Sequence, residues 1–104
     1  CITARVQNGV AERLILHPRD HGCHASDVEW SDEATWGSQA LEALNNGGPL
    51  LAALRWNAGA YLWLTGQSDS LAEGIERAES VLEDGGALNV LDQLRRWRND
   101  FSIR

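Results

Sequence analysis

The feature that most constrains the fold is the segment Pro49 to Thr65, which is apolar on nearly every side of a helical projection. Two apolar stripes run along it at helical spacing, and Arg55 and Asn57 are nearly its only polar residues. A helix that is apolar on most sides is usually packed by protein on most sides, so this one is predicted to be central. Gly59 in its middle costs about 1 kcal/mol relative to Ala, which indicates a close backbone neighbour.

Three further helices are predicted from apolar periodicity and from glycines that end each run. With the central helix, the expected ranges are about 35–46, 49–65, 70–84 and 87–99. The third begins at Ser70-Leu-Ala-Glu73, a capping box in which the hydroxyl and the carboxylate accept from orphan amides. The last helix is expected to bury its apolar residues, which are Leu88, Val90, Leu91, Leu94 and Trp97.

The N-terminal part is predicted to be a β-hairpin over residues 2–16, followed by a polar loop over 17–33. Asn8-Gly9 is the strongest short hairpin signal, because both residues tolerate positive φ. The second strand ends on an apolar run, Leu14-Ile15-Leu16, which indicates burial on both faces or pairing with a larger sheet. An isolated two-stranded hairpin is only marginally stable in water, so this one must pack against helices or join a larger sheet. The chain is thus predicted to be a single α+β unit, residues 1–104.

Charge and composition argue against several classes of function. The formal charge of −6 would repel nucleic acid and anionic membranes. No apolar run approaches the ~20 residues of a membrane span, and no signal-peptide pattern opens the chain. All nine basic residues are Arg, so Schiff-base lysines and phosphate-loop lysines are excluded. Because the chain has no Met, Cys1 is not expected to be an initiating residue.

Two cysteines, Cys1 and Cys23, are too few to staple a secreted miniprotein. We expect two thiols in a reducing, cytoplasmic compartment, with a Cys1–Cys23 disulfide as the alternative. Four candidate soft ligands lie within eight residues, namely His17, His21, Cys23 and His24. Their spacing could hold zinc, but it lacks the paired pattern of zinc modules. A surface loop with Cys23 tucked into the core is the favoured interpretation.

Other polar candidates have structural interpretations that we favour. Asn46-Gly47-Gly48 could offer amides to a phosphate, but glycines at this position usually end a helix. The cluster Arg95-Arg96-Trp97-Arg98 could contact phosphate, but Asp92 lies four residues before Arg96 and would pair with it. Asn57 is expected to brace a neighbouring loop rather than line a pocket. Four of the five Trp residues lie on apolar helix faces, which favours packing over ligand stacking.

Several motifs together resemble the C-terminal end of anthranilate phosphoribosyltransferases or of a close paralogue. The segment Thr3-Ala-Arg-Val-Gln-Asn-Gly9 resembles the family's late hairpin, and Leu16-His-Pro-Arg-Asp-His-Gly-Cys23 resembles the turn that follows it. Trp56-Asn57-Ala58 falls on an Asn-Ala pair of the family's central helix. Ser70-Leu-Ala-Glu-Gly74 and Ser80-Val-Leu-Glu-Asp-Gly-Gly-Ala-Leu88 follow its last two helices. In this family, His21 and Cys23 occupy positions that are usually apolar, which weakens the zinc interpretation.

The resemblance implies that this segment is the C-terminal layer of a larger α/β domain. Family members transfer phosphoribose from phosphoribosyl diphosphate to anthranilate, with magnesium, in tryptophan biosynthesis. Their diphosphate loop and acidic magnesium ligands lie upstream, so no catalytic, substrate-binding or metal residue is assigned to this segment. The implied partner is the upstream part of the same enzyme, which forms a homodimer at full length. The alternative is a free-standing, non-catalytic helical module that binds a protein through a surface around Trp36, Trp56 and Trp63.

Overall fold

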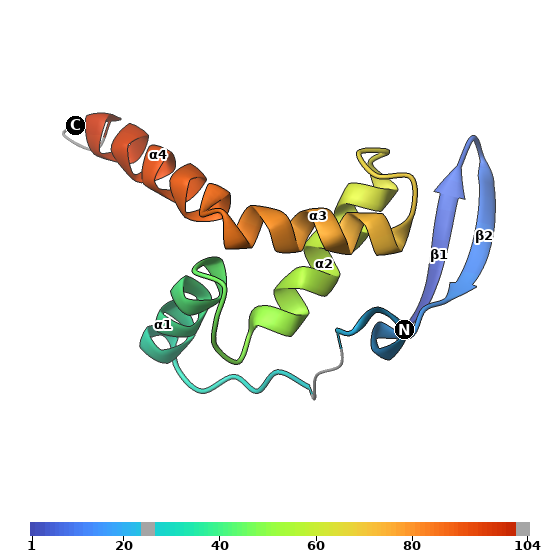
Figure 1. Cartoon of the computed structure of the whole chain (residues 1–104), viewed down its shortest axis with the longest axis horizontal. Helices are drawn as coiled ribbons and strands as arrows, with labels where there is room; N and C mark the ends of the chain where they lie inside the picture. The colour runs from blue at the N-terminus through green and yellow to red at the C-terminus, as the bar shows by residue number, and fades with distance from the viewer. Residues whose placement is uncertain (24–26, 102–104) are drawn as a thin grey trace.

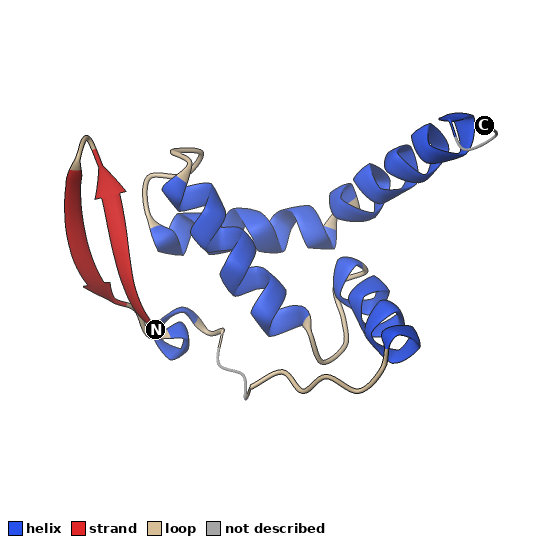
Figure 2. Ribbon diagram, turned by 180° about the vertical axis from the view of Figure 1, so that it is seen from behind, coloured by secondary structure: helices blue, strands red, loops and turns tan. Residues whose placement is uncertain are grey.

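The computed structural model describes residues 1–23 and 27–101 and contains a hairpin followed by four helices (Figures 1 and 2). This arrangement confirms the predicted α+β class. The strands are β1 (Ile2–Gln7) and β2 (Val10–Ile15), and a 3-10 turn covers Pro18–His21 within the segment expected to be loop. The helices are α1 (Glu33–Leu44), α2 (Leu51–Leu64), α3 (Leu71–Glu83) and α4 (Gly86–Phe101).

The hairpin has one face toward the helices and one face toward solvent. The strands pair antiparallel from Ile2 opposite Ile15 to Gln7 opposite Val10, around Asn8 and Gly9 with φ of 52° and 77°. On the inner face the guanidinium carbon of the partly buried Arg5 lies 4.9 Å from the centre of a Trp63 ring on α2. The outer face carries three exposed apolar residues, Ile2, Val6 and Ile15. No third strand pairs with either edge among the residues that the structure describes.

The core lies where α2 crosses α3 (Figure 2). Gly59 of α2 and Gly74 of α3 bring the two backbones together: a Cβ added at Gly74 would clash with the Gly59 carbonyl oxygen. The close backbone neighbour expected at Gly59 is therefore Ile75 with Gly74. A cluster of buried side chains, Cys23, Leu71 and Ile75, is flanked by the partly buried Leu16, Trp56, Ala60 and Trp63. This is a small core for a chain of 104 residues.

Three burial predictions are wrong for this chain. Helix α2 is packed less completely than predicted: Gly59 is its single buried residue, and Asn57, Tyr61 and Leu64 are exposed along one side. No residue of α4 is buried, because this helix leaves the body after its first turn, so the predicted burial of Val90, Leu94 and Trp97 does not occur (Figure 1). Of the two alternatives given for the second strand, burial on both faces does not occur within this chain, since Ile15 is exposed. Val90, Leu94 and Trp97 on α4 and Ile15 on β2 are apolar residues that the described part of the chain leaves uncovered.

Local capping sets the helix bounds. Helix α1 begins at Glu33, two residues before the expected start, because the Asp32 carboxylate accepts from the Thr35 amide at 2.7 Å. The Ser70 hydroxyl accepts from the Glu73 amide at 3.1 Å, as the capping box predicts. The Glu73 carboxylate, however, accepts from the Asp69 amide rather than from that of Ser70. At the C-terminal end, α4 continues to Phe101 instead of ending at 99.

Candidate functional site

The candidate ligands that the structure describes, His17, His21 and Cys23, do not come together as a metal site. Within residues 1–23 and 27–101, no group of three or more His, Cys, Asp or Glu side chains could hold a metal ion. His21 instead packs against the Trp56 ring, with the ring centroids 5.9 Å apart. Cys23 is 3% exposed in the core, which confirms the interpretation of this residue as a small hydrophobe. The candidate ligand His24 lies outside the described residues.

The Cys23 thiol lies beside a cavity between the 3-10 turn and α2. Burial raises the pKa of this thiol, the nearby Glu79 carboxylate raises it further, and the Arg55 guanidinium partly offsets both effects. A neutral thiol is a weak nucleophile, so the pocket does not activate Cys23. The cavity has a volume of about 250 Å³, and Cys1 and Asn57 also line it. Both cysteines are free, so the alternative of a disulfide between them is not what the structure contains.

Asn57 is exposed, and its side chain bonds within its own helix. The Nδ2 group donates to the Ala53 carbonyl oxygen at 2.8 Å, so the expected hydrogen bond to a neighbouring loop is absent.

The segment Asn46-Gly47-Gly48 ends α1, as favoured from the sequence. The Gly47 amide donates to the Glu42 carbonyl, and Asn46 and Gly48 have φ of 62° and 79°. These residues therefore have structural explanations that do not require a ligand.

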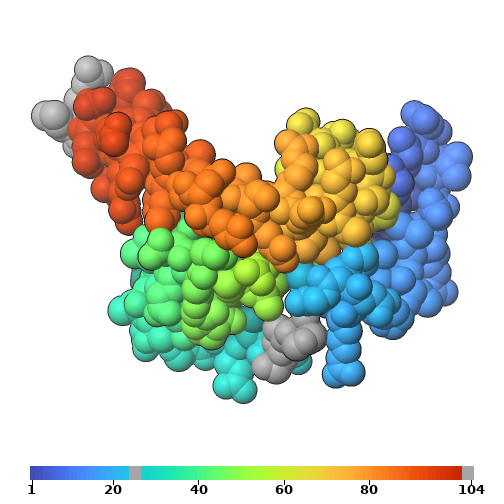
Figure 3. Space-filling view, viewed as in Figure 1, coloured from blue at the N-terminus to red at the C-terminus, as the bar shows by residue number. Residues whose placement is uncertain are grey.

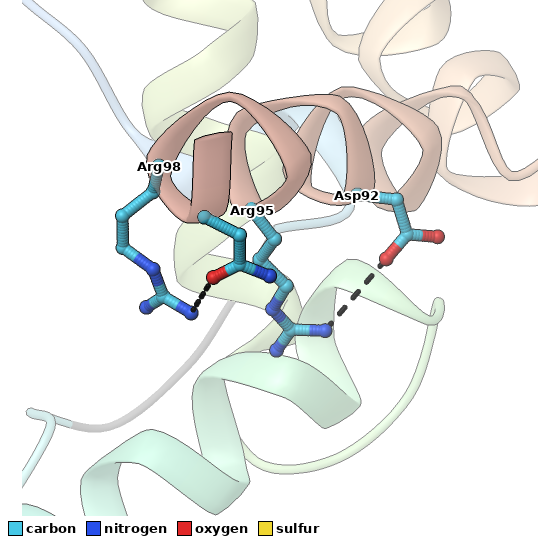
Figure 4. A network of polar contacts seen from close by, with 4 residues as sticks. Asp92, Arg95 and Arg98 are labelled. Carbon is cyan, nitrogen blue, oxygen red and sulfur yellow. Dashed lines mark hydrogen bonds and ion pairs between the residues drawn. The ribbon is translucent and has the colours of Figure 1, made fainter. Parts of the chain in front are cut away.

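Two arginines of α4, Arg95 and Arg98, interact with side chains of the same helix (Figure 4). Asp92 forms an ion pair with Arg95, three residues on, at 3.7 Å between Nη1 and Oδ1, instead of the predicted pair with Arg96. Arg98 donates to the Asn99 side chain at 3.4 Å. Both partners of the ion pair are about half exposed, so their interaction contributes little to stability.

An apolar groove of about 410 Å³, which the sequence does not predict, lies between the helices. Residues of all four helices line it, and Tyr61 on α2 and Val81 on α3 are its exposed large apolar residues. The other lining residues are Leu44, Leu54, Ala58, Leu62, Thr65, Ala78, Leu82 and Ala87. An apolar groove without converging charged or polar groups suits another apolar surface better than a reacting substrate.

The tryptophans are more exposed than the sequence predicts. Trp30, Trp36 and Trp97 are each at least half exposed. Among the tryptophans that the structure describes, only Trp56 and Trp63 pack against the core, and both side chains are partly buried. On α1 and α4 the apolar residues Trp36, Leu41, Leu94 and Trp97 are exposed, although Ala43 of α1 is buried.

No helix within the described ranges is long and apolar enough to cross a membrane.

Comparison with known protein families finds no family model that matches the chain. The chain is 36% identical over 95 residues to the anthranilate phosphoribosyltransferase of Xanthomonas campestris pv. campestris (strain B100), a match that covers 88% of this chain and 28% of that protein. It is 34% identical over 97 residues to the same enzyme of Laribacter hongkongensis (strain HLHK9), covering 89% of this chain and 28% of the relative.

A third relative, the anthranilate phosphoribosyltransferase of Xanthomonas euvesicatoria pv. vesicatoria (strain 85-10), is 32% identical over 107 aligned positions, which cover 99% of this chain and 31% of that protein. The chain thus spans less than a third of the length of the curated relatives it matches. The resemblance found in the motifs is confirmed by these matches, and the chain is related to a C-terminal segment of the anthranilate phosphoribosyltransferases.

Proposed function

We propose that this chain is the C-terminal structural part of a phosphoribosyltransferase that transfers phosphoribose from phosphoribosyl diphosphate to anthranilate, in tryptophan biosynthesis. The names of its relatives support the transferase class and the acceptor. The segment supplies no catalytic or substrate-binding residue and is inactive by itself. The chemistry is carried by the upstream part of the enzyme, which is cytoplasmic and forms a homodimer.

The observation that carries this proposal is the uncovered hairpin. Its outer face presents Ile2, Val6 and Ile15, and its edges have no further strand among the described residues. A two-stranded hairpin is marginal in water unless it joins a larger sheet or packs against other elements. In the proposed enzyme, β1 and β2 join a sheet formed by the upstream part, and α2 and α3 pack behind that sheet.

Magnesium is implied for the full-length enzyme but does not fit the residues of this segment. The described ranges bring together no three side chains of the kinds that bind metals. Magnesium prefers carboxylate oxygens and substrate phosphates in octahedral geometry. The magnesium ligands are therefore assigned to the upstream part of the enzyme, together with the steps of the reaction.

A chimera tests the proposal directly. The matched segment of the Xanthomonas campestris enzyme would be replaced by this chain, and transfer to anthranilate would be followed by the loss of anthranilate fluorescence. We expect the chimera to turn over, and the same enzyme truncated before the segment to be inactive. A chimera with native-like circular dichroism and dimeric mass but no transfer would contradict the proposed function.

Two matched variants of the chimera test the role of the hairpin. Val6→Glu puts a charge on the outer apolar face, whereas Gln7→Glu puts the same charge on the opposite face, beside the turn. We expect Val6→Glu to lower activity and thermal stability, because a carboxylate is costly to bury on a face that the rest of the enzyme covers. Gln7→Glu should leave both nearly unchanged. Equal effects would show that the outer face is not covered in the enzyme.

The second candidate function is a free-standing protein-interaction module. It is favoured by Trp36, which is 50% exposed on α1, together with partial exposure of Trp56 and Trp63. Its prediction is a cooperative, monomeric chain that unfolds in one sharp transition without any upstream segment. The proposed enzyme part should instead show a broad transition or associate, so thermal unfolding combined with mass measurement separates the two functions.

A further inference from the structure

The two cysteines of the chain border the same cavity, the space of about 250 Å³ beside the 3-10 turn. Cys1 is exposed, whereas Cys23 is 3% exposed in the core. Both ribbon views place the N-terminus beside the 3-10 turn that precedes Cys23 (Figures 1 and 2). The fold therefore brings one accessible cysteine and one buried cysteine to a common space.

The register of the hairpin places Cys1 on its inner face. Two backbone hydrogen bonds, of 2.7 and 2.8 Å, join Cys1 to Leu16 and extend the ladder of β1 and β2 by one pair. Because side chains alternate between the faces of a strand, Cys1 shares a face with the partly buried Thr3 and Arg5. Leu16, which lies opposite Cys1 on that face, packs against the cluster that contains Cys23. Cys1 thus lies on the side of the hairpin where Cys23 is buried.

The 3-10 turn fixes the position of Cys23. Its amide donates to the Pro18 carbonyl oxygen at 2.9 Å, and its thiol donates to the His21 carbonyl oxygen at 3.5 Å. The space-filling view shows this segment lying against α3, next to the hairpin (Figure 3). Both cysteines are therefore positioned by backbone hydrogen bonds within residues 1–23, the segment that a bond between them would close.

We propose that Cys1 and Cys23 are a reversible redox pair, which a small-molecule disulfide such as oxidised glutathione converts to a disulfide that fastens the base of the hairpin to the core. The exposed Cys1 reacts first: its thiol loses a proton, and the sulfur attacks the S–S bond of the oxidant and releases one thiol. The Cys23 thiol then loses its proton, and its sulfur attacks the Cys1 sulfur and releases the second small thiol. Two protein thiols are oxidised, and one small disulfide is reduced to two thiols.

The inference goes beyond the proposed function, because the exchange needs neither anthranilate nor the upstream part of the enzyme. Its test equilibrates the chain in glutathione redox buffers, with and without urea, and counts the disulfides by mass after acid quenching. A disulfide that fits the fold is favoured by folding as much as it stabilises the fold. We expect an equilibrium constant at least ~10-fold larger in the folded chain than in urea. An equal or smaller constant in the folded chain, or a folded chain that stops at a mixed disulfide on Cys1, would overturn the proposal.

A matched variant tests the placement of the thiol within the folded chain. Cys1→Ala combined with Ile2→Cys moves the thiol by one residue to the outer face, where Ile2 is 73% exposed. This variant should still form a mixed disulfide with glutathione, but its equilibrium constant for bonding to Cys23 should be at least ~10-fold smaller than that of the unmodified chain. Cys23→Ala should give the mixed disulfide on Cys1 alone. A displaced thiol that bonds to Cys23 as readily as Cys1 does would show that the inner face does not position this pair.

Discussion

The crossing of α2 and α3 leaves no room for a side chain at Gly59. A Cβ built there would lie 2.4 Å from Ile75 Cγ1, 2.7 Å from its Cα and 2.8 Å from its amide nitrogen. Carbon atoms in ordinary contact are about 3.5–4.0 Å apart, so the helices would have to separate by roughly 0.8 Å or more. Two of the three atoms belong to the backbone, and Ile75 is 3% exposed, so no rotamer change relieves the clash.

Two opposing terms set the size of the effect of Gly59→Ala. Alanine is a better helix former than glycine by about 0.5–1 kcal/mol. Overpacking a well-packed core costs typically about 1–3 kcal/mol. Since the clash is against backbone, the cost should lie in the upper part of that range. We expect a net loss of about 1–2 kcal/mol in the free energy of unfolding.

Gly37→Ala in α1 is the matched control, because nothing lies within 4 Å of a Cβ at that position. It should stabilise the chain by about 0.5–1 kcal/mol through helix propensity alone. Urea unfolding followed by tryptophan fluorescence would report both variants, since Trp56 and Trp63 lie on α2 beside the core. If Gly59→Ala stabilised the chain as much as Gly37→Ala, the close crossing of the two helices would be wrong.

Single contacts give three further predictions. Bonds from the Thr35 amide and hydroxyl lower the pKa of the Asp32 carboxyl, so its stabilisation of α1 is complete above about pH 4 and is lost as pH falls through the folded-state pKa. Asp32→Asn should keep the cap and remove that pH dependence from the helical circular dichroism signal. Arg5→Ala should weaken the attachment of the hairpin to α2 by about 0.5–1 kcal/mol, seen as faster amide exchange in β1, with Arg5→Lys intermediate. A thiol reagent at neutral pH should modify the exposed Cys1 quickly and Cys23 slowly, and two equal rates would contradict the burial of Cys23.

Local signals in the sequence are sufficient for most of the secondary structure. The Asn8-Gly9 turn and the Ser70 cap both lie where the sequence predicts them. Each depends on residues within a few positions of one another, so neighbouring side chains decide it. The Asp32 cap is a signal of the same type, and it would have placed the start of α1 correctly; apolar periodicity alone starts this helix two residues too late.

Burial could not be predicted in the same way. The apolar patterns of α2 and α4 correctly mark surfaces that need a cover, but periodicity does not show whether the cover belongs to this chain. Leu94 and Trp97 are predicted to lie in the core and are exposed, while the groove at Tyr61 and Val81 has no local signal. That groove depends on how the helices pack together, which requires contacts between residues distant in sequence.

The hairpin carries one charge on its otherwise apolar outer face. Arg13 pairs opposite Ala4, and it shares that face with Ile2, Val6 and Ile15. Open strands with apolar faces tend to stack into aggregates, and a charge on the exposed face opposes this by making each stacked copy repel the next. We therefore expect this single exposed guanidinium to limit aggregation of the chain wherever its outer face is uncovered. Arg13 would then affect solubility without taking part in the folded core.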